Sequence, residues 1–208
     1  MTSFEQAILA FDRSLRVFAL PARASRPYPA ESVPDVEMAE ESRKKSGGLM
    51  RVNHTGEVCA QALYQSQALF AQNADTRSAL EHAAQEEWDH LAWCAQRLTE
   101  LNDRPSFLNP VWYAGSFLMG AASALAGDRW NMAFLVETER QVESHLNSHM
   151  ASLPAEDFRS RAIVETMREE EAAHAVMAES RGAAEMPATL KFVMGATAKL
   201  MTNTAYWV

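Results

Sequence analysis

The chain has 208 residues, which is enough for one domain with a sizeable hydrophobic core. With 48% hydrophobic and 22% charged residues, its composition excludes a disordered chain. A net charge of −8, without any basic cluster, argues against nucleic acid as a partner. Neither Cys59 nor Cys94 has a CxxC partner, so we expect reduced thiols in a cytoplasmic setting, although both could simply be small core residues.

The first 47 residues are predicted to form an amphipathic helix followed by a linker. Charged residues interrupt the apolar ones, so this segment is not expected to be a signal peptide. Pro21 marks the expected end of the helix, and residues 21–47 are rich in Pro, Ser, Glu and Gly, as in a linker or surface arm. The apolar residues at helical spacing are Phe4, Ile8, Phe11, Leu15 and Phe18.

From Gly48 onward the sequence is predicted to be almost wholly helical. No convincing alternating strand pattern appears, so the expected fold class is all-α, and the long helices with short breaks indicate a helical bundle. The predicted helices cover 49–72, 76–101, 110–126, 129–151, 155–181 and 188–204.

One motif occurs twice in these helices. Glu87-x-x-His90 lies in "EEWDHL", and Glu171-x-x-His174 lies in "REEEAAH". A spacing of three places both side chains on one helix face, where they can reach a common ion. On an inward face a carboxylate and an imidazole are costly unless something compensates them.

A further glutamate precedes each pair at a similar distance, Glu57 before the first and Glu139 before the second. In an antiparallel hairpin, residues equally far from the turn lie at the same depth. The midpoints fall at about residues 72–73 and about residues 155–156, both in predicted turns. Two such hairpins would bring six ligands to one level, which is the ligand set of a carboxylate-bridged di-iron or di-manganese site.

The charge of this set also indicates a metal site. Four glutamates carry a formal charge of −4, which two divalent cations would balance, and without cations they would repel one another. Carboxylate-rich ligands without sulfur suit iron or manganese better than zinc or copper(I). Singly, each residue could be a solvated or ion-paired surface residue. The neighbours that remain open as alternative ligands are Glu86, Glu170, Glu137, Glu143 and His54.

Three other residues could lie around such a site. Glu143 and His145 could form hydrogen bonds to the metal ligands without binding the metal themselves, or they could be exposed. Tyr64 follows Glu57 by seven residues and shares its face, so it could be a redox tyrosine or a core residue.

Taken together, "RVNHTGE", "EEWDHL", "ETERQVESH" and "REEEAAH" resemble the demethoxyubiquinone hydroxylases of ubiquinone biosynthesis, which are ferritin-like di-iron monooxygenases. The resemblance covers roughly residues 48–208 and places His145 near the metals, but Ser144 and Leu146 stand where the family often has His and Tyr. By this resemblance Glu87 and Glu171 bridge two iron ions. The implied ligands are Glu57, Glu87, His90, Glu139, Glu171 and His174.

The resemblance implies hydroxylation of the ring of a 2-polyprenyl-3-methyl-6-methoxy-1,4-benzoquinol (demethoxyubiquinol) with O₂. No GxGxxG fingerprint is present, so reducing equivalents are expected from outside, from NADH or from a partner such as another ubiquinone-biosynthesis protein. The alternatives are another ferritin-like di-iron oxidase or peroxidase, or an iron-storage protein. The lack of CxxC pairs weighs against a full rubrerythrin plan.

Residues 105–127 contain no charged side chain and are long enough to be considered as a membrane span. Glycine and serine interrupt them, however, and they fall in the crossover between the hairpins. We expect a helix at the membrane surface with Trp112 and Tyr113 at the interface, the alternative being a buried crossover helix. Residues 188–208 could join this surface. The binding would be peripheral, on the cytoplasmic face of the cell (inner) membrane if the protein is bacterial.

Overall fold

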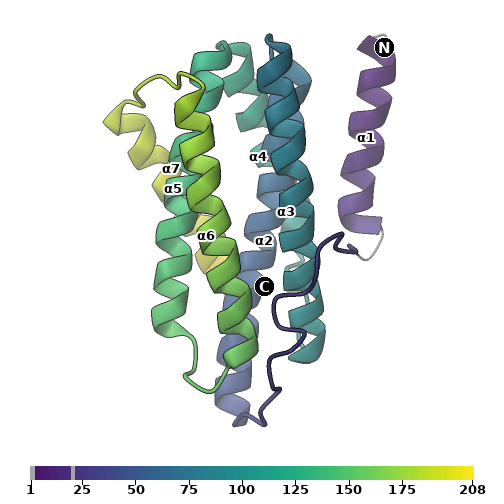
Figure 1. Ribbon diagram of the computed structural model, residues 1–208, viewed down its shortest axis with the longest axis vertical. Helices are drawn as coiled ribbons and strands as arrows, with labels where there is room; N and C mark the ends of the chain where they lie inside the picture. The colour runs from purple at the N-terminus through teal and green to yellow at the C-terminus, as the bar shows by residue number, and fades with distance from the viewer. Residues whose placement is uncertain (1–2, 20–21) are drawn as a thin grey trace.

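The computed structural model describes residues 3–19 and 22–208, and the regular structure within them is α-helical (Figure 1). This confirms the predicted all-α class. Five of the six helices predicted after residue 48 begin and end within three residues of the predicted positions. The helices are α1 (Ser3–Ala19), α2 (Glu40–Phe70), α3 (Ala74–Glu100), α4 (Asn109–Leu125), α5 (Asp128–Ser152), α6 (Phe158–Ser180) and α7 (Ala188–Trp207).

The exception is α2, which begins at Glu40, nine residues before the predicted start. The expected linker is therefore partly helical, and the expected division of the chain between residues 47 and 48 falls inside α2. Glu40 pairs with Arg43 at 2.6 Å and with Lys44 at 3.2 Å, contacts one turn apart that favour a helix. Gly48, from which the helical part was predicted to run, lies well inside α2 and meets a packing requirement, because a Cβ there would lie 2.6 Å from the ring of Tyr206.

At the N-terminus, α1 covers the segment predicted as an amphipathic helix. Pro21, the expected end of that helix, lies outside the described residues, and so do the side chains of Phe4 and Phe11.

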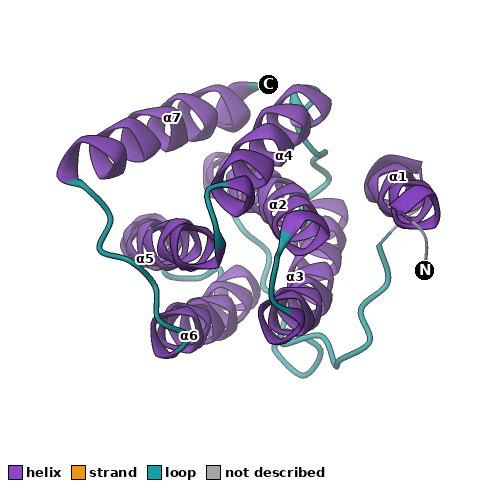
Figure 2. Cartoon of the chain, turned by 90° about the horizontal axis from the view of Figure 1, so that it is seen from above, coloured by secondary structure: helices purple, strands orange, loops and turns teal. Residues whose placement is uncertain are grey.

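The bundle consists of two antiparallel hairpins, α2–α3 and α5–α6, as Figure 2 shows from above. The helix α4 crosses between them and packs along α2, and α7 lies on the same side of the bundle as α4. Side-chain caps begin the second helix of each hairpin: Asn73 accepts a hydrogen bond from the Asp75 amide at 2.8 Å, and Asp157 accepts one from the Ser160 amide at 2.9 Å. The cap at Asp157 starts α6 three residues later than predicted.

Two of the three apolar clusters of the described interior lie on either side of a polar layer. One core contains Met50, Trp93, Leu98, Leu146, Ile163 and Met167. The other contains Tyr64, Leu80, Met132, Leu135 and Ala178. Between them lie the inward-facing glutamates and histidines of all four bundle helices, so the fold delivers the predicted site to its own centre. Cys94 is a buried thiol of the first core, and Cys59 is also a free thiol.

The close packing of α4 on α2 yields a stability prediction. A Cβ at Gly120 would lie 2.9 Å from the backbone oxygen of Leu63 and would also strike Ser66, whereas a Cβ at Gly115 in the same helix meets nothing within 4 Å. We expect Gly120→Ala to lower the free energy of unfolding by about 1–3 kcal/mol. Gly115→Ala should raise it by about 0.5–1 kcal/mol through helix propensity. Urea unfolding measures both, and equal effects of the two substitutions would contradict the packing described here.

Candidate metal centre

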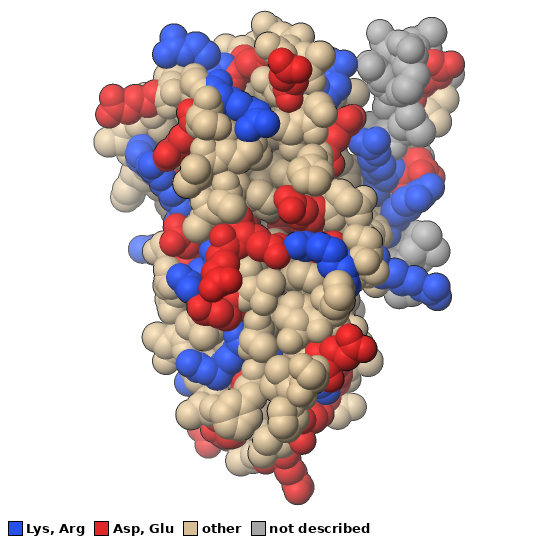
Figure 3. Space-filling view, in the orientation of Figure 1, with Lys and Arg blue, Asp and Glu red and all other residues tan. Residues whose placement is uncertain are grey.

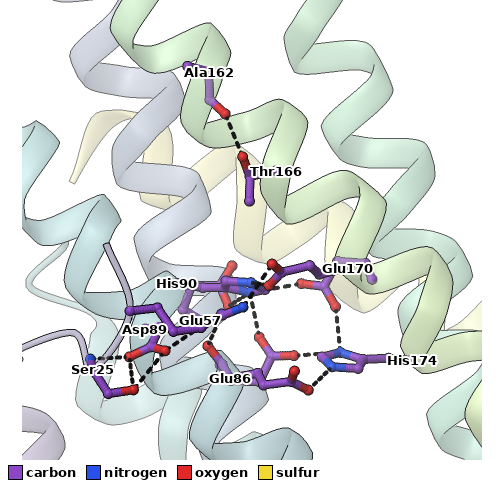
Figure 4. Close-up of polar contacts among 12 residues, drawn as sticks. Ser25, Glu57, Glu86, Asp89, His90, Ala162, Thr166, Glu170 and His174 are labelled. Carbon is purple, nitrogen blue, oxygen red and sulfur yellow. Dashed lines mark hydrogen bonds and ion pairs between the residues drawn. The ribbon is translucent and has the colours of Figure 1, made fainter. Parts of the chain in front are cut away.

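The structure brings all six predicted ligands together, from α2, α3, α5 and α6, in the polar layer (Figure 4 labels Glu57, His90 and His174). They are deeply buried, with relative exposures from 0% to 5%. The potential ligands form two groups, and Glu171 belongs to both. Within each group the ligand atoms all lie within 4.8 Å of one another. The first group is Glu57, Glu87, His90 and Glu171, and the second is Glu139, Glu171 and His174.

Glu87 and Glu171 lie between the two histidines. The two carboxylate oxygens of Glu87 are 3.1 Å from His90 Nδ1 and 3.0 Å from His174 Nδ1. The oxygens of Glu171 are 3.5 Å and 3.3 Å from the same two nitrogens. Each carboxylate thus offers one oxygen to each histidine, which is the disposition required of a carboxylate that bridges two cations.

On the outer side of the histidines lie Glu86 and Glu170, in a crossed arrangement. His90 Nε2 is 2.7 Å from Glu170, and His174 Nε2 is 2.8 Å from Glu86. A carboxylate at this nitrogen favours the tautomer with its proton on Nε2, which leaves the Nδ1 lone pair directed into the cluster. The geometry therefore separates Glu86 and Glu170, open alternatives in the sequence, from the inner set.

Tyr64 contacts the site directly, since its hydroxyl donates a hydrogen bond to Glu139 at 2.8 Å. Two inner carboxylate oxygens are buried without a donor when the imidazole protons are on Nε2: Glu57 Oε2, and Glu87 Oε1, which then faces the Nδ1 lone pair of His174 at 3.0 Å. A buried carboxylate oxygen without a donor is costly unless a cation compensates it. These two oxygens, with the bridging positions of Glu87 and Glu171, fit a site for two divalent cations.

The electrostatics of the cluster show the same deficit of positive charge. Burial, together with the charge of Glu87, raises the pKa of Glu57 well above its usual value, and burial with the charge of Glu171 does the same to the pKa of Glu139. Although burial acts to lower it, hydrogen bonds to Glu171 and Glu87 raise the pKa of His174 to about 12. Without cations the cluster therefore retains protons at neutral pH.

The remaining candidates from the sequence lie elsewhere. Among the described residues, no hydrogen bond joins the side chain of His145 or Glu143 to the six inner residues. The ring of His145 lies 3.9 Å from that of His149, about 9 Å along α5 from Glu139. Glu143 faces the charge of Arg168.

Two alternative ligands also have partners outside the cluster. Glu137 pairs with Lys191 at 3.2 Å. His54 Nδ1 lies 3.4 Å from the side-chain amide of Asn109.

One contact of the site was not predicted from the sequence. Asp89 is 1% exposed and accepts hydrogen bonds from Ser25 and Arg26, which belong to the segment interpreted as a linker (Figure 4 labels Ser25 and Asp89). The available signal was an acidic residue inside an otherwise buried stretch of α3, since such a residue requires a partner.

Two hairpins that carry a buried layer of glutamates and histidines at mid-height define a ferritin-like fold with a candidate metal site. A solved structure of a dodecameric thioferritin, the bacterioferritin-related protein from Bacteroides fragilis, aligns with a TM-score of 0.52 at 18% identity, over 78% of this chain and 98% of that chain. This likeness concerns the fold alone.

The sequence identifies the family more narrowly. Residues 44–205 match the family described as ubiquinone biosynthesis protein COQ7, and the chain belongs to this family. A protein of Nitrosomonas europaea named 3-demethoxyubiquinol 3-hydroxylase is 51% identical over 208 residues, which cover the whole of both chains. Proteins of the same name from Chromobacterium violaceum and Polynucleobacter necessarius are 51% and 52% identical, each over at least 98% of both chains.

The raised pKa values yield a prediction about metal binding. Because Glu57, Glu139 and His174 hold protons in the cation-free cluster, binding of Fe²⁺ or Mn²⁺ should release protons, and the apparent affinity should rise with pH. Anaerobic titration calorimetry at pH 6.0 and 7.5, in two buffers of different ionisation enthalpy, measures both effects. An affinity independent of pH, with no buffer-dependent heat, would contradict the proton retention inferred here.

Proposed function

We propose that the protein is a di-iron monooxygenase that hydroxylates the ring of demethoxyubiquinol, a 2-polyprenyl-3-methyl-6-methoxy-1,4-benzoquinol, with O₂ in ubiquinone biosynthesis. The observation that carries the proposal is the buried cluster itself, with two carboxylates placed to bridge and two carboxylate oxygens lacking a donor. Full-length relatives with about half of their residues identical, named 3-demethoxyubiquinol 3-hydroxylase, support the substrate.

In this proposal six residues would hold two iron ions, and Glu87 and Glu171, whose carboxylates each face both histidines, would be the bridging ligands. When bound, the iron supplies the reduction of O₂ that ring hydroxylation needs. The ligands are Glu57, Glu87, His90, Glu139, Glu171 and His174.

The surrounding residues hold the ligands in place and exclude water. Glu170 and Glu86 fix the orientation of the two imidazole rings, and Tyr64 holds one oxygen of Glu139. The apolar cores above and below the layer shield it from solvent. We propose that electrons come from outside the chain, from NADH or from another protein of ubiquinone biosynthesis, because the sequence contains no GxGxxG fingerprint.

The proposed partner at the surface is a membrane, bound peripherally on the cytoplasmic face of the inner membrane. Within the described residues, none of the helices has the length and apolar character needed to cross a bilayer. Two neighbouring helices nevertheless expose apolar side chains, and α7 is tied to the segment before α4 by the hydrogen bond from the Phe107 amide to the Val208 carbonyl (3.1 Å). The exposed residues include Val111, Leu118 and Leu125 on α4, and Phe192, Val193, Leu200 and Trp207 on α7.

One detail of the predicted membrane surface is wrong. Tyr113, expected at the interface, is 7% exposed and donates a hydrogen bond to Gln65 at 2.7 Å. In α4 the polar side chains Asn109, Tyr113 and Ser116 point inward, while the outer face carries the apolar ones. The side chains of Asn109 and Tyr113 therefore make hydrogen bonds to α2 and α1, and the apolar face of this weakly hydrophobic helix remains outside.

The function is tested by the quinone profile of cells that lack this protein, complemented with variants. Wild type should remove accumulated demethoxyubiquinol, and Glu171→Ala should not, with a loss greater than the about 100-fold typical of residues behind a metal ligand. Glu169→Ala, an exposed glutamate two positions away in α6, is the matched control and should complement. An unchanged ubiquinone pool in the deletion strain would overturn the substrate and direct attention to iron storage or peroxide reduction.

Membrane binding is tested separately by sedimentation with vesicles of phosphatidylethanolamine and phosphatidylglycerol. Leu118 and Phe192 are 70% and 77% exposed on α4 and α7, whereas Val176 is 65% exposed on α6. We expect the double variant Leu118→Glu and Phe192→Glu to bind at least about tenfold more weakly, because it loses two apolar side chains from the contact. Val176→Glu should bind like wild type. Equal binding by all three proteins would exclude this face.

A further inference from the structure

The segment from residue 22 to residue 39 does more than connect α1 to α2. Figure 1 shows it descending beside α3 toward the start of α2, and Figure 3 shows acidic and basic side chains meeting at mid-height of this face. The backbone carbonyl of Arg23 accepts a hydrogen bond from Trp88 Nε1 at 3.2 Å, which attaches the segment to α3. This attachment lies at the level of the metal centre.

Arg26 is the residue of this segment that makes the most contacts with the bundle. Its Nε donates to Asp89 at 2.6 Å, and its Nη1 donates to Glu170 at 2.8 Å. Its guanidinium carbon also lies 4.8 Å from the centre of the Trp93 ring. The planar fork of an arginine can hold two carboxylates at fixed positions in this way, which a lysine cannot.

The two carboxylates that Arg26 holds belong to different hairpins. Asp89 in α3 is further fixed by the amide of Ser25, which donates to it at 2.6 Å. Glu170 in α6 uses its second oxygen to accept from His90 Nε2 at 2.7 Å. An unbroken chain of charged hydrogen bonds therefore runs from the N-terminal segment to one histidine of the centre.

The carboxylate that holds the other histidine has no such partner. The side chain of Glu86, which binds His174 Nε2, pairs with no lysine or arginine among the described residues, and Arg26 reaches only its backbone carbonyl, at 3.5 Å. Asp89 directly precedes His90, whereas the residue that directly precedes His174 is the exposed Ala173. The two halves of the centre repeat the same glutamates and histidine, but only the half that contains His90 has an anchor for an arginine.

We propose that Arg26 is a positioning residue that, through Glu170, holds the ring of His90 and so makes one of the two metal positions more firmly bound than the other. The inference rests on the proposed di-iron centre. It assigns the N-terminal segment a role at that centre, and it predicts that loss of this one contact weakens one iron while leaving the other unchanged.

The test uses the full-length protein loaded anaerobically with two equivalents of ⁵⁷Fe²⁺ and then challenged with a ferrous chelator. In Arg26→Gln we expect one iron to be released about 10-fold or more faster than in wild type and the second at the wild-type rate. Mössbauer spectra before the challenge should show one altered iron environment and one unaltered. Glu86→Gln should perturb the opposite iron, and Arg23→Gln, the same charge change at an exposed position of the same segment, should behave as wild type.

The controls separate this inference from the function on which it rests. If wild type does not bind two irons, the metal centre fails and the inference fails with it. If wild type binds two irons but Arg26→Gln releases both equally or neither faster, only the inference is overturned. If Arg26→Gln loses helix content, the release of the two irons is measured in Arg26→Lys instead, with the same expected outcomes. Loss of helix content in both variants would show that Arg26 supports the fold and would also overturn the proposal.

Discussion

Mutual repulsion among four buried carboxylates at one level of the bundle is the constraint on which the rest of the structure depends. Glu57, Glu87, Glu139 and Glu171 are each at most 3% exposed, and burying such groups without compensation would cost more than a domain of this size can bear. Two histidines directed inward, a tyrosine on Glu139, and positions that could hold cations beside Glu57 and Glu87 offset this repulsion.

The apolar cores determine the electrostatic surroundings of this layer. They lie above and below it, so the low-dielectric surroundings strengthen every electrostatic contact inside the layer and make each missing contact more expensive. The outer carboxylates Glu86 and Glu170 are about a quarter to a third exposed. The carboxylates are therefore fully buried at the centre and partly exposed at the rim. At the rim, solvent or an arginine can neutralise their charge.

Much of this arrangement could be predicted from the sequence. A helical period determines which residues share a face, and an antiparallel hairpin determines which residues share a depth, so Glu57 could be matched to the pair of Glu87 and His90. The choice between Glu86 and Glu87 could not be made in this way. Both lie within one turn of His90, and the rotation of α3 against α6 decides which carboxylate faces inward.

Other features depend on tertiary contacts that leave little trace in local sequence. Arg26 lies 63 residues from Asp89 in a segment without periodicity, so nothing near it in the chain indicates its partner. The apolar composition of residues 105–127 indicated an unusual helix but not which of its faces points outward. For that reason Tyr113 was predicted at the surface, whereas it is buried. The early start of α2 was hidden by Gly47 and Gly48, which the close packing against Asp103 and Tyr206 requires.

The crossed hydrogen bonds between the hairpins make assembly all-or-none. The helix α3 supplies the carboxylate that holds the histidine of α6, and α6 supplies the one that holds the histidine of α3. A slip of one hairpin by a single helical turn, about 5.4 Å, would break both bonds and separate the bridging carboxylates from their opposite histidines. The group of Glu57, Glu87, His90 and Glu171 draws on both hairpins, although Glu139, Glu171 and His174 all belong to α5–α6. Only a centre with both cation positions complete would therefore require the two hairpins to have docked in the correct register.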